Sequence, residues 1–458
     1  MPLTATTFAA MHNCFCSGAT RTLAFRKKQL QLLKNAVKQF EPLLQRALHA
    51  DLRKSPEEAY ATEIGLVYAE ITHALQHLGE WMQPEKVSTP LMLFPSSSKI
   101  VRDPLGISLI IAPWNYPAQL LLSPLAGAIA AGNCVVLKPS ELAPHTAAVI
   151  EQMIQTFFSE EHIMVVQGDG ALVVRQLLKA YRFDHIFFTG SIPVGKSIAS
   201  MAAETLTPVT LELGGKSPCI VDETANIAVA AARITWGKFT NAGQTCVAPD
   251  YLLVKNDCRD ALLQQIQQHV HRFYTADPAA SPDYGRIINR RRFDKLLSYL
   301  PQGNILFGGQ ANAADLYIAP TVMDQVRHTQ PLMQEEIFGP LLPVFTYRTN
   351  EEAADLVRQH SNPLSLYVFS NNRKTQDYFT ENLGFGGGCI NNTLVHLSNP
   401  NLPFGGLGCS GTGQYHGKYS FDAFTRPKAI LQTATWIDPP VKYPPYAGKM
   451  KWFKRFLR

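Results

Sequence analysis

The sequence predicts an α/β protein built around a parallel sheet of βαβ units. Between Pro104 and Leu213, short β-rich runs alternate with helical stretches, and strands and helices that alternate in this way form parallel sheets. The apolar runs are continuous, as expected of strands whose two faces are both covered. A chain of 458 residues that is 46% hydrophobic fills two or three such domains, so a small module and a disordered chain are both excluded.

The expected elements follow in order along the chain. The first hundred residues look helical, and Ser55-Pro56-Glu57-Glu58 has the composition of a helix start. Strands are then expected at residues 106–112, 134–139, 163–168 and 185–190, with helices near 118–131, 144–158 and 171–180 and from about 194. A second α/β region begins near Leu213, with helices near 226–240 and 257–274 and strands at 251–254, 365–370 and 389–392.

Charge and cysteine content exclude several classes of protein. The 42 basic and 36 acidic side chains leave a net charge of +6, which is too thin an excess for nucleic-acid binding. The 8 cysteines contain no CxxC pair, so neither a disulfide scaffold nor a zinc site is expected. We therefore expect a cytoplasmic protein with reduced cysteines and no bound metal, and the N-terminus shows no secretory signal.

Two segments raise the question of membrane contact. Residues 104–137 carry no charge, but Pro113, Pro117 and Pro124 divide this run into pieces shorter than the roughly 20 residues of a membrane span. The C-terminal sequence KMKWFKRFLR is basic and aromatic, a composition compatible with peripheral membrane contact. An ordinary solvated C-terminus is the favoured interpretation.

A phosphate-loop pattern, GxxxxGK[ST], is matched in full from Gly190 to Ser197. Taken alone, it suggests a nucleotide triphosphatase. Such loops hold phosphate with successive backbone N–H groups, however, and Pro193 has none. A dinucleotide pyrophosphate at the N-terminus of the following helix needs fewer donors. The triphosphatase is therefore kept as the alternative interpretation.

Two further motifs combine reactive side chains with tight turns. Glu212 stands at an expected strand end before Gly214 and Gly215, where it is either a salt-bridged turn residue or a general base. Cys246 follows a Gly-Gln-Thr loop at the expected end of a helix. Most single cysteines are small buried hydrophobes, but this placement suits a nucleophile held on a turn.

Together the motifs resemble those of the aldehyde dehydrogenase superfamily, and within it those of class 3. The resemblance runs from about residue 19 to about residue 446, and its ordered motifs are PWNYP (113–117), KPSE (138–141), FTGS with VGK (188–196), ELGGK (212–216), GQTC (243–246), EEIFGP (335–340) and LPFGG (402–406). YHGKYSF (415–421) and YPPY (443–446) look typical of class 3. Each motif alone is weak, but chance agreement on the whole series is negligible.

The resemblance implies a catalytic set. Cys246 matches the family nucleophile, which attacks the aldehyde carbon. Asn115 matches the side-chain donor of the oxyanion hole, paired with the backbone N–H of Cys246. Glu212 matches the residue that activates water. Oxidation would then pass through a cysteine thiohemiacetal and a thioester to a carboxylic acid.

The resemblance also implies how the cofactor is held. Gly190, Ser191 and Gly195 match the loop and helix start that bind the pyrophosphate. Glu336 and Phe338 match residues that hold the nicotinamide ribose and ring.

Cofactor choice depends on two further matches. Lys138 and Glu141 correspond to positions near the adenine ribose, where a carboxylate binds the 2′-hydroxyl and disfavours a 2′-phosphate. NAD is therefore expected, and NADP is allowed because Lys138 can offset the repulsion.

An apolar substrate funnel is expected beside the catalytic motifs. Tyr116, Leu120 and Trp236 would line it, and such a lining suits hydrophobic aldehydes, aliphatic or aromatic. Ordinary core packing explains each of the three equally well. His416 would either face the funnel or cap a helix.

The family fold implies a division of the chain. The expected domains are a Rossmann-like NAD-binding domain (1–84 and 104–211) and an α/β catalytic domain (212–415). A β-hairpin oligomerisation arm (85–103 and 416–440) projects from them, and a tail (441–458) follows. The arm implies a homodimer. An enzyme that passes the acyl group to coenzyme A is the nearest rival activity, and Glu212 as a water activator favours hydrolysis.

Overall fold

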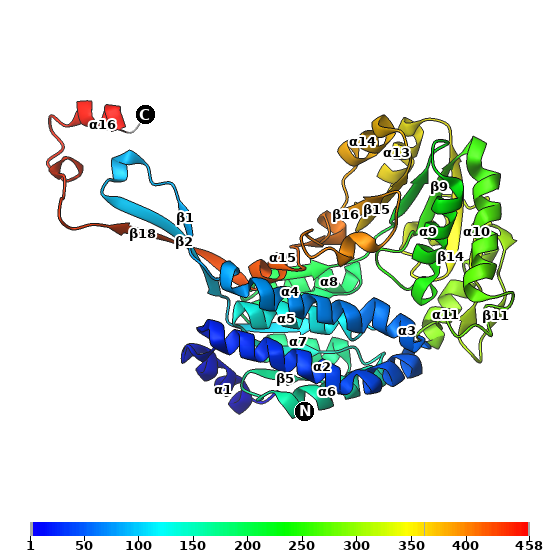
Figure 1. The fold of residues 1–458 in the computed structure, drawn as a ribbon, viewed down its shortest axis with the longest axis horizontal. Coiled ribbons are helices and arrows are strands. Elements are labelled where there is room, and N and C mark those ends of the chain that lie inside the picture. Colours follow the sequence, from blue (N-terminus) through cyan, green and yellow to red (C-terminus); the bar gives the residue numbers. More distant parts are fainter. Residues whose placement is uncertain (1–2, 361, 457–458) are drawn as a thin grey trace.

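Two largely parallel sheets, each covered by helices, form the body of the molecule, and a thin arm projects from it (Figure 1). The computed structural model describes residues 3–360 and 362–456. The α/β class predicted from the alternation of strands and helices is confirmed. Within the described ranges, no helix is long and apolar enough to cross a membrane.

The first sheet has six strands in the order β17-β7-β6-β3-β4-β5. Five are parallel, β3 (Ile107–Ile111), β4 (Cys134–Lys138), β5 (Ile163–Val165), β6 (His185–Thr189) and β7 (Val209–Glu212), and the antiparallel β17 (Gly411–Thr412) pairs with β7. The chain runs outward from β3 to β5 and then returns to the other side of β3 with β6. Parallel sheets bind ligands at such a reversal, beyond the carboxyl ends of the strands.

Helices cover both faces of this sheet. They are α1 (Ala5–Cys16), α2 (Leu23–Leu52), α4 (Gly65–Trp81), α5 (Gln119–Ala131), α6 (Pro144–Phe157), α7 (Gly170–Ala180) and α8 (Ile192–Ala203). Every residue of α5 is buried, because α5 lies between the sheet and the helices α2 and α4. The uncharged run at 104–137 is therefore the core of this sheet, as its prolines predicted.

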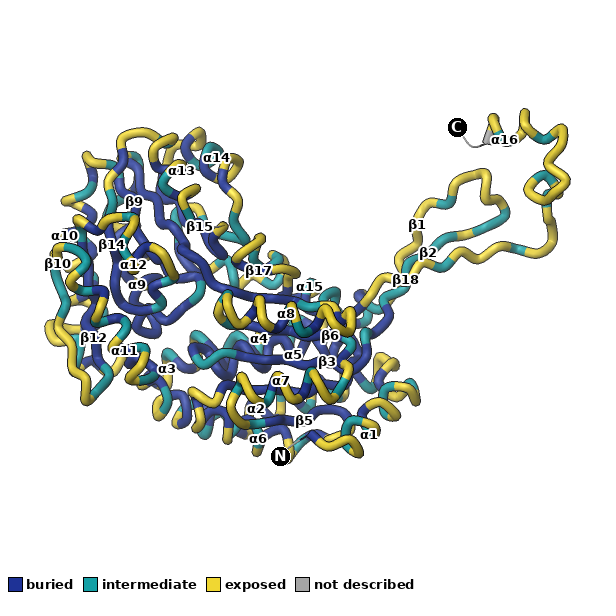
Figure 2. Tube along the Cα trace, turned by 180° about the vertical axis from the view of Figure 1, so that it is seen from behind, coloured by how far each residue is buried: buried dark blue, intermediate teal, exposed yellow. Residues whose placement is uncertain are grey.

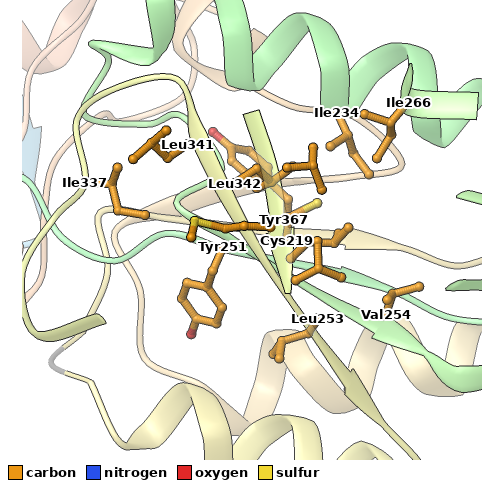
Figure 3. Packing of buried hydrophobic residues seen from close by; sticks show 14 of the residues in the cluster. Cys219, Ile234, Tyr251, Leu253, Val254, Ile266, Ile337, Leu341, Leu342 and Tyr367 are labelled. Carbon is orange, nitrogen blue, oxygen red and sulfur yellow. The ribbon is translucent and has the colours of Figure 1, made fainter. Parts of the chain in front are cut away.

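The second sheet has seven strands in the order β10-β13-β14-β9-β8-β15-β16. Six are parallel, β8 (Pro218–Val221), β9 (Tyr251–Lys255), β13 (Thr321–Asp324), β14 (Leu341–Tyr347), β15 (Ser365–Phe369) and β16 (Gly387–Ile390), while β10 (Asn304–Phe307) is antiparallel. The flanking helices include α9 (Ile227–Phe239), α10 (Arg259–Tyr274), α11 (Arg290–Leu297), α13 (Asn350–Arg358) and α14 (Arg373–Asn382). Cys219, Tyr251 and Leu253 pack in its buried core, which Ile234 and Ile266 complete from the helices (Figure 3).

The arm is a three-stranded antiparallel sheet. Its strands are β1 (Glu85–Val87), β2 (Ser96–Pro104) and β18 (Thr425–Thr433), and β18 pairs with β2 along its whole length. The arm and the tail with α16 (Met450–Phe456) are mostly exposed, in contrast to the buried strands of the body (Figure 2). The helix α15 (Lys418–Ala423) packs on α5, so the arm strand begins only at Thr425. The domain boundaries drawn from the sequence stay a prediction.

The close packing of α15 on α5 can be tested at a glycine. A Cβ on Gly127 would lie 2.6 Å from the Cβ of Ser420, and overpacking of this kind typically costs about 1–3 kcal/mol. We therefore expect Gly127→Ala to lower the midpoint of urea unfolding. The matched control is Gly79→Ala in α4, where the nearest atom would be 3.9 Å away. Alanine is favoured there by up to about 1 kcal/mol, so equal shifts in both variants would contradict the packing.

Candidate active site

A single cavity brings together side chains from the facing edges of the two sheets. It encloses about 820 Å³ including its mouth, and Tyr116, Thr189 and Glu212 reach it from the carboxyl ends of strands of the first sheet. Cys246 and Leu364 reach it from segments that precede β9 and β15 of the second sheet. Much of the remaining wall is apolar and includes Leu66, Leu120, Trp236, Leu394, Leu397 and Phe404. The cavity suits a largely apolar ligand that reacts at one polar end.

Cys246 lies on a turn with unusual backbone geometry. Asn241, Ala242 and Gly243, directly before it, have φ angles of 52°, 50° and 74°. A side chain on Gly243 would overlap the carbonyl oxygen of Gly339, so only glycine fits there. Non-glycine residues in the left-handed region cost free energy and cluster at functional sites. The turn directs the half-buried Cys246 into the cavity.

Burial and two neighbouring carboxylates favour the protonated form of this thiol. Burial raises the pKa of the Cys246 thiol, and the carboxylates of Glu336 and Glu212 raise it further. A thiol in this setting needs a neighbouring base before it can act as a nucleophile.

Glu212 is placed to be that base. It is the last residue of β7, is 2% exposed and lines the cavity with Cys246. Neither carboxylate oxygen has a hydrogen-bond partner among the described residues, and burial raises its pKa well above the usual value. An unpaired buried carboxyl group is costly for stability, which marks this position as a candidate functional group. The sequence left two interpretations of Glu212, a salt-bridged turn residue and a general base. Among the described residues, Glu212 has no ion-pair partner, so the structure favours the general base.

Asn115 connects the first sheet to the cysteine turn. It follows β3, is buried, and its Nδ2 donates to the carbonyl oxygen of Gln244 at 3.0 Å. One hydrogen of the amide nitrogen is used in this bond, and the second is left for another acceptor. Beside it, the hydroxyl groups of Tyr116 and Thr245 lie 2.6 Å apart. A side-chain N–H donor is thus held next to the turn that carries Cys246.

The phosphate-loop segment forms a strand–loop–helix corner. The loop of Gly190 and Ser191 follows β6, and α8 begins at Ile192 with Pro193 in its first turn. A Cβ on Gly195 would lie 2.6 Å from the Leu213 side chain, so glycine lets α8 pack closely against the end of β7. Free N–H groups at a helix N-terminus and a close helix–strand contact fit a dinucleotide pyrophosphate.

Lys138 and Glu141 lie further along the same edge of the first sheet. The buried Lys138 Nζ donates to Glu141 Oε2 at 3.1 Å and to the carbonyl oxygen of Pro139 at 2.7 Å. The Glu141 side chain is 39% exposed, so it can accept hydrogen bonds from a ribose.

Glu336 and Phe338 lie on the opposite, second-sheet side of the cleft. Burial and, to a smaller extent, the charge of Asp250 raise the pKa of Glu336 to about 8. Its carboxylate occupies the space where a side chain on Gly214 would stand. The ring of Phe338 meets that of Trp114 edge to face, with centroids 5.3 Å apart. Glu336 lies close enough to Cys246 for its charge to raise the pKa of that thiol. This position fits the nicotinamide end of a bound cofactor.

The predicted funnel residues also meet in the cavity. Tyr116, Leu120 and Trp236 all line it, and Trp236 is exposed at its edge. His416 lines it as well, and its φ of 79° is unusual for a residue with a side chain. Burial lowers the pKa of His416 to about 3, so its imidazole is neutral.

Part of the cavity lining was not predicted from the sequence. Thr62 and Leu66 reach the cavity from the helical segment before the arm, and Leu394 and Leu397 reach it from a loop after β16. None of them belongs to a motif. Phe404 and Tyr415 lie inside two of the quoted motifs, which is the signal that could have found them.

Comparisons with known proteins agree on one family. The sequence profile of the Aldehyde dehydrogenase family matches residues 5–430. The chain is 49% identical over 446 residues to a 4,4′-diaponeurosporen-aldehyde dehydrogenase of Staphylococcus aureus, covering 97% of each chain. It is 43% identical to human aldehyde dehydrogenase family 3 member B1, covering 97% of this chain and 95% of the relative.

Solved structures lead to the same conclusion. A structure described as the substrate-bound state of Staphylococcus aureus AldH superposes with a TM-score of 0.97 at 47% identity, covering 100% of both chains. An NAD-dependent aldehyde dehydrogenase from Sinorhizobium meliloti gives 0.85 at 29% identity, covering 94% of this chain and 88% of that chain.

The protein belongs to the aldehyde dehydrogenase family. The similarity to family 3 members confirms the class 3 resemblance, and the relatives support an NAD-dependent oxidation of aldehydes. The triphosphatase alternative finds no support among them.

The exposed carboxylate at Glu141 should set the cofactor preference. We expect a higher kcat/KM with NAD than with NADP, because the carboxylate repels a 2′-phosphate. Glu141→Gln should narrow the ratio of the two kcat/KM values, since glutamine keeps the shape without the charge. Glu151→Gln, a substitution on the neighbouring helix α6, serves as the charge-matched control. A wild-type enzyme with the higher kcat/KM for NADP would show that Lys138 dominates this site.

Proposed function

We propose that the protein oxidises hydrophobic aldehydes, aliphatic or aromatic, to carboxylic acids through covalent intermediates on Cys246. The observation that carries the proposal is that one apolar cavity contains the half-buried Cys246 thiol and the unpaired Glu212 carboxyl group, with the Asn115 amide beside it. The Staphylococcus aureus relative is named for 4,4′-diaponeurosporen-aldehyde. The apolar wall of this cavity supports an apolar aldehyde for this chain too.

In the first step, the Cys246 sulfur bonds to the aldehyde carbon as Glu212 takes the thiol proton. The negative charge that develops on the aldehyde oxygen is stabilised by the free N–H of the Asn115 amide and by the backbone N–H of Cys246. Loss of one such donor typically costs about 3 kcal/mol of transition-state stabilisation.

The thiohemiacetal must then lose a hydride, and bound NAD supplies the acceptor. Glu336 and Phe338 would orient the nicotinamide ribose and ring, and the loop at Gly190 and Ser191 would hold the pyrophosphate at the start of α8. The cysteine turn then carries a thioester.

Hydrolysis completes the reaction. Glu212, after releasing the thiol proton to solvent, takes a proton from water, and the hydroxide bonds to the thioester carbon. The carbon–sulfur bond then breaks to release the acid and the Cys246 thiolate, which takes the proton back from Glu212. The carboxylate form is required, and it is lost as the pH falls through the raised pKa of Glu212. Direct hydrolysis by this base favours a free acid over transfer to coenzyme A.

The arm supports a homodimer. Its tip and the following segment expose large apolar side chains, among them Leu91 at 80% and Trp436 at 70%, and exposed apolar surface of this kind marks interaction sites. Sedimentation velocity tests the dimer.

Two further expectations from the sequence stay predictions. The protein is expected in the cytoplasm. Its C-terminal tail is expected to be solvated, and peripheral membrane contact is the less favoured alternative.

The role of Glu212 can be separated from that of Cys246. Glu212→Gln should form the acyl enzyme but hydrolyse it slowly, because glutamine cannot take a proton from water. Rapid mixing should show an NADH burst close to one per active site, followed by a slow steady state, with the acyl group retained on Cys246 by intact mass. Because Glu212 also takes the thiol proton, the burst should be slow at neutral pH. Raising the pH above the usual thiol value of about 8.5 should speed the burst but not turnover, since burial raises the pKa of Cys246.

The neutral control is Glu223→Gln, which removes a carboxylate from an exposed ion pair with Lys255 and should turn over like the wild type. Wild-type turnover by Glu212→Gln, with no trapped acyl enzyme, would contradict the assignment. Glu336 would then be the first alternative base.

A further inference from the structure

A fully buried ion pair lies behind the wall of the cavity. Lys54 precedes α3 (Pro56–Ala59), and Glu63 lies in the π-helical turn Tyr60–Ile64. Both side chains are completely buried, with Lys54 Nζ 2.6 Å from Glu63 Oε1. Removing two charges from water is costly unless further hydrogen bonds compensate them. The partners of the pair therefore show which part of the protein it holds in place.

The remaining contacts of Lys54 converge on the dipeptide that carries the amide donor. Its Nζ donates to the backbone carbonyl oxygen of Asn115 at 3.0 Å. The same atom lies 4.0 Å from the ring centroid of Tyr116, within the range of a cation–π contact. An ammonium group has three N–H donors, and Glu63, Asn115 and the Tyr116 ring account for three directions around it.

Glu63 holds the other end of the same segment. Its Oε2 accepts hydrogen bonds from the backbone N–H of Ala118 at 2.8 Å and of Gln119 at 3.2 Å. These N–H groups lie at the N-terminus of α5, where helices have unpaired donors and where negative charge is stabilised. The ion pair thus fixes the chain from Asn115 to Gln119 at both ends.

The cysteine turn binds the same carbonyl oxygen as Lys54. Asn241 Nδ2 donates to the Asn115 oxygen at 2.8 Å and to the Gln244 oxygen at 3.2 Å. The Gln244 oxygen in turn accepts from Asn115 Nδ2. Displacement of the Asn115 backbone would therefore change the position of its side-chain donor relative to Cys246.

We propose that Lys54, paired with Glu63, is a positioning residue for the reaction: it fixes Asn115 against the Cys246 turn and so supports formation of the covalent intermediate. Lys54 is not among the described residues that line the cavity, so it acts through Asn115 and not on the aldehyde. The inference rests on the proposed function, because it needs Asn115 as the oxyanion donor.

A double-mutant cycle tests the proposal. The variants are Lys54→Met, Asn115→Ala and their combination, and the readouts are the rate of the NADH burst, the Kd for NAD and the thermal midpoint. Lys54→Met should slow the burst by about tenfold to a hundredfold, since small displacements of catalytic groups have effects of this size, with the Kd for NAD unchanged. In the Asn115→Ala background, Lys54→Met should slow the burst little further, because both changes remove the same contribution, that of the Asn115 donor.

A second variant separates positioning from folding. Lys54→Met leaves the Glu63 charge buried and unpaired, so Lys54→Met/Glu63→Gln should regain thermal stability while its burst stays slow. The matched control is Lys255→Met/Glu223→Gln, a partly exposed ion pair, whose burst should equal that of the wild type.

Three results would overturn the proposal, and they can be told apart. Additive losses for Lys54→Met and Asn115→Ala, or a wild-type burst in the folded Lys54→Met/Glu63→Gln protein, would remove the positioning role and leave the proposed function standing. A wild-type burst in Asn115→Ala itself would remove the oxyanion role and, with it, this inference.

Discussion

The hydrogen bonds between Asn115 and the Cys246 turn are the interaction on which the site depends. Asn115 lies at the carboxyl edge of the first sheet, whereas Asn241 and Gln244 lie in the segment that leads into the second. The two bonds, at 3.0 and 2.8 Å, fix the facing edges of the sheets against each other. Cys246 and Glu212, which come from different sheets, meet in one cavity beside this contact.

Several features of the site lower the stability of the folded state, and the rest of the fold must offset them. Glu212 is buried without a hydrogen-bond partner among the described residues, and Asn241 and Ala242 have left-handed backbones. Each feature destabilises the folded state. The large apolar cores on both sheets supply the compensation, since their strands and α5 are buried almost throughout. The unpaired groups of the site are tolerated because the elements that carry them are deeply buried.

The sequence predicted β3 to β6 of the first sheet and β9, β15 and β16 of the second, because strands covered on both faces are continuous apolar runs. It did not predict β8, β13 and β14, which lie in the same buried second sheet. The expected strand at 163–168 ends early, at Val165, because Gly168 has a φ of 124° and Asp169 caps α7. Glu212 and Cys246 could be found from their turns and motifs. Lys54 and Glu63 could not, because their partners lie 61 and 55 residues away along the chain and no local pattern marks such contacts.

NADH formation by Cys246→Ala with NAD and an apolar aldehyde tests most sharply whether Cys246 is the nucleophile in this cavity. We expect both turnover and burst to be lost while NAD still binds, because the cofactor residues lie elsewhere. Cys389→Ala, at a half-buried thiol beside His396, should remain active as the control. Substantial turnover by freshly purified Cys246→Ala would contradict this assignment and place the nucleophile at another residue.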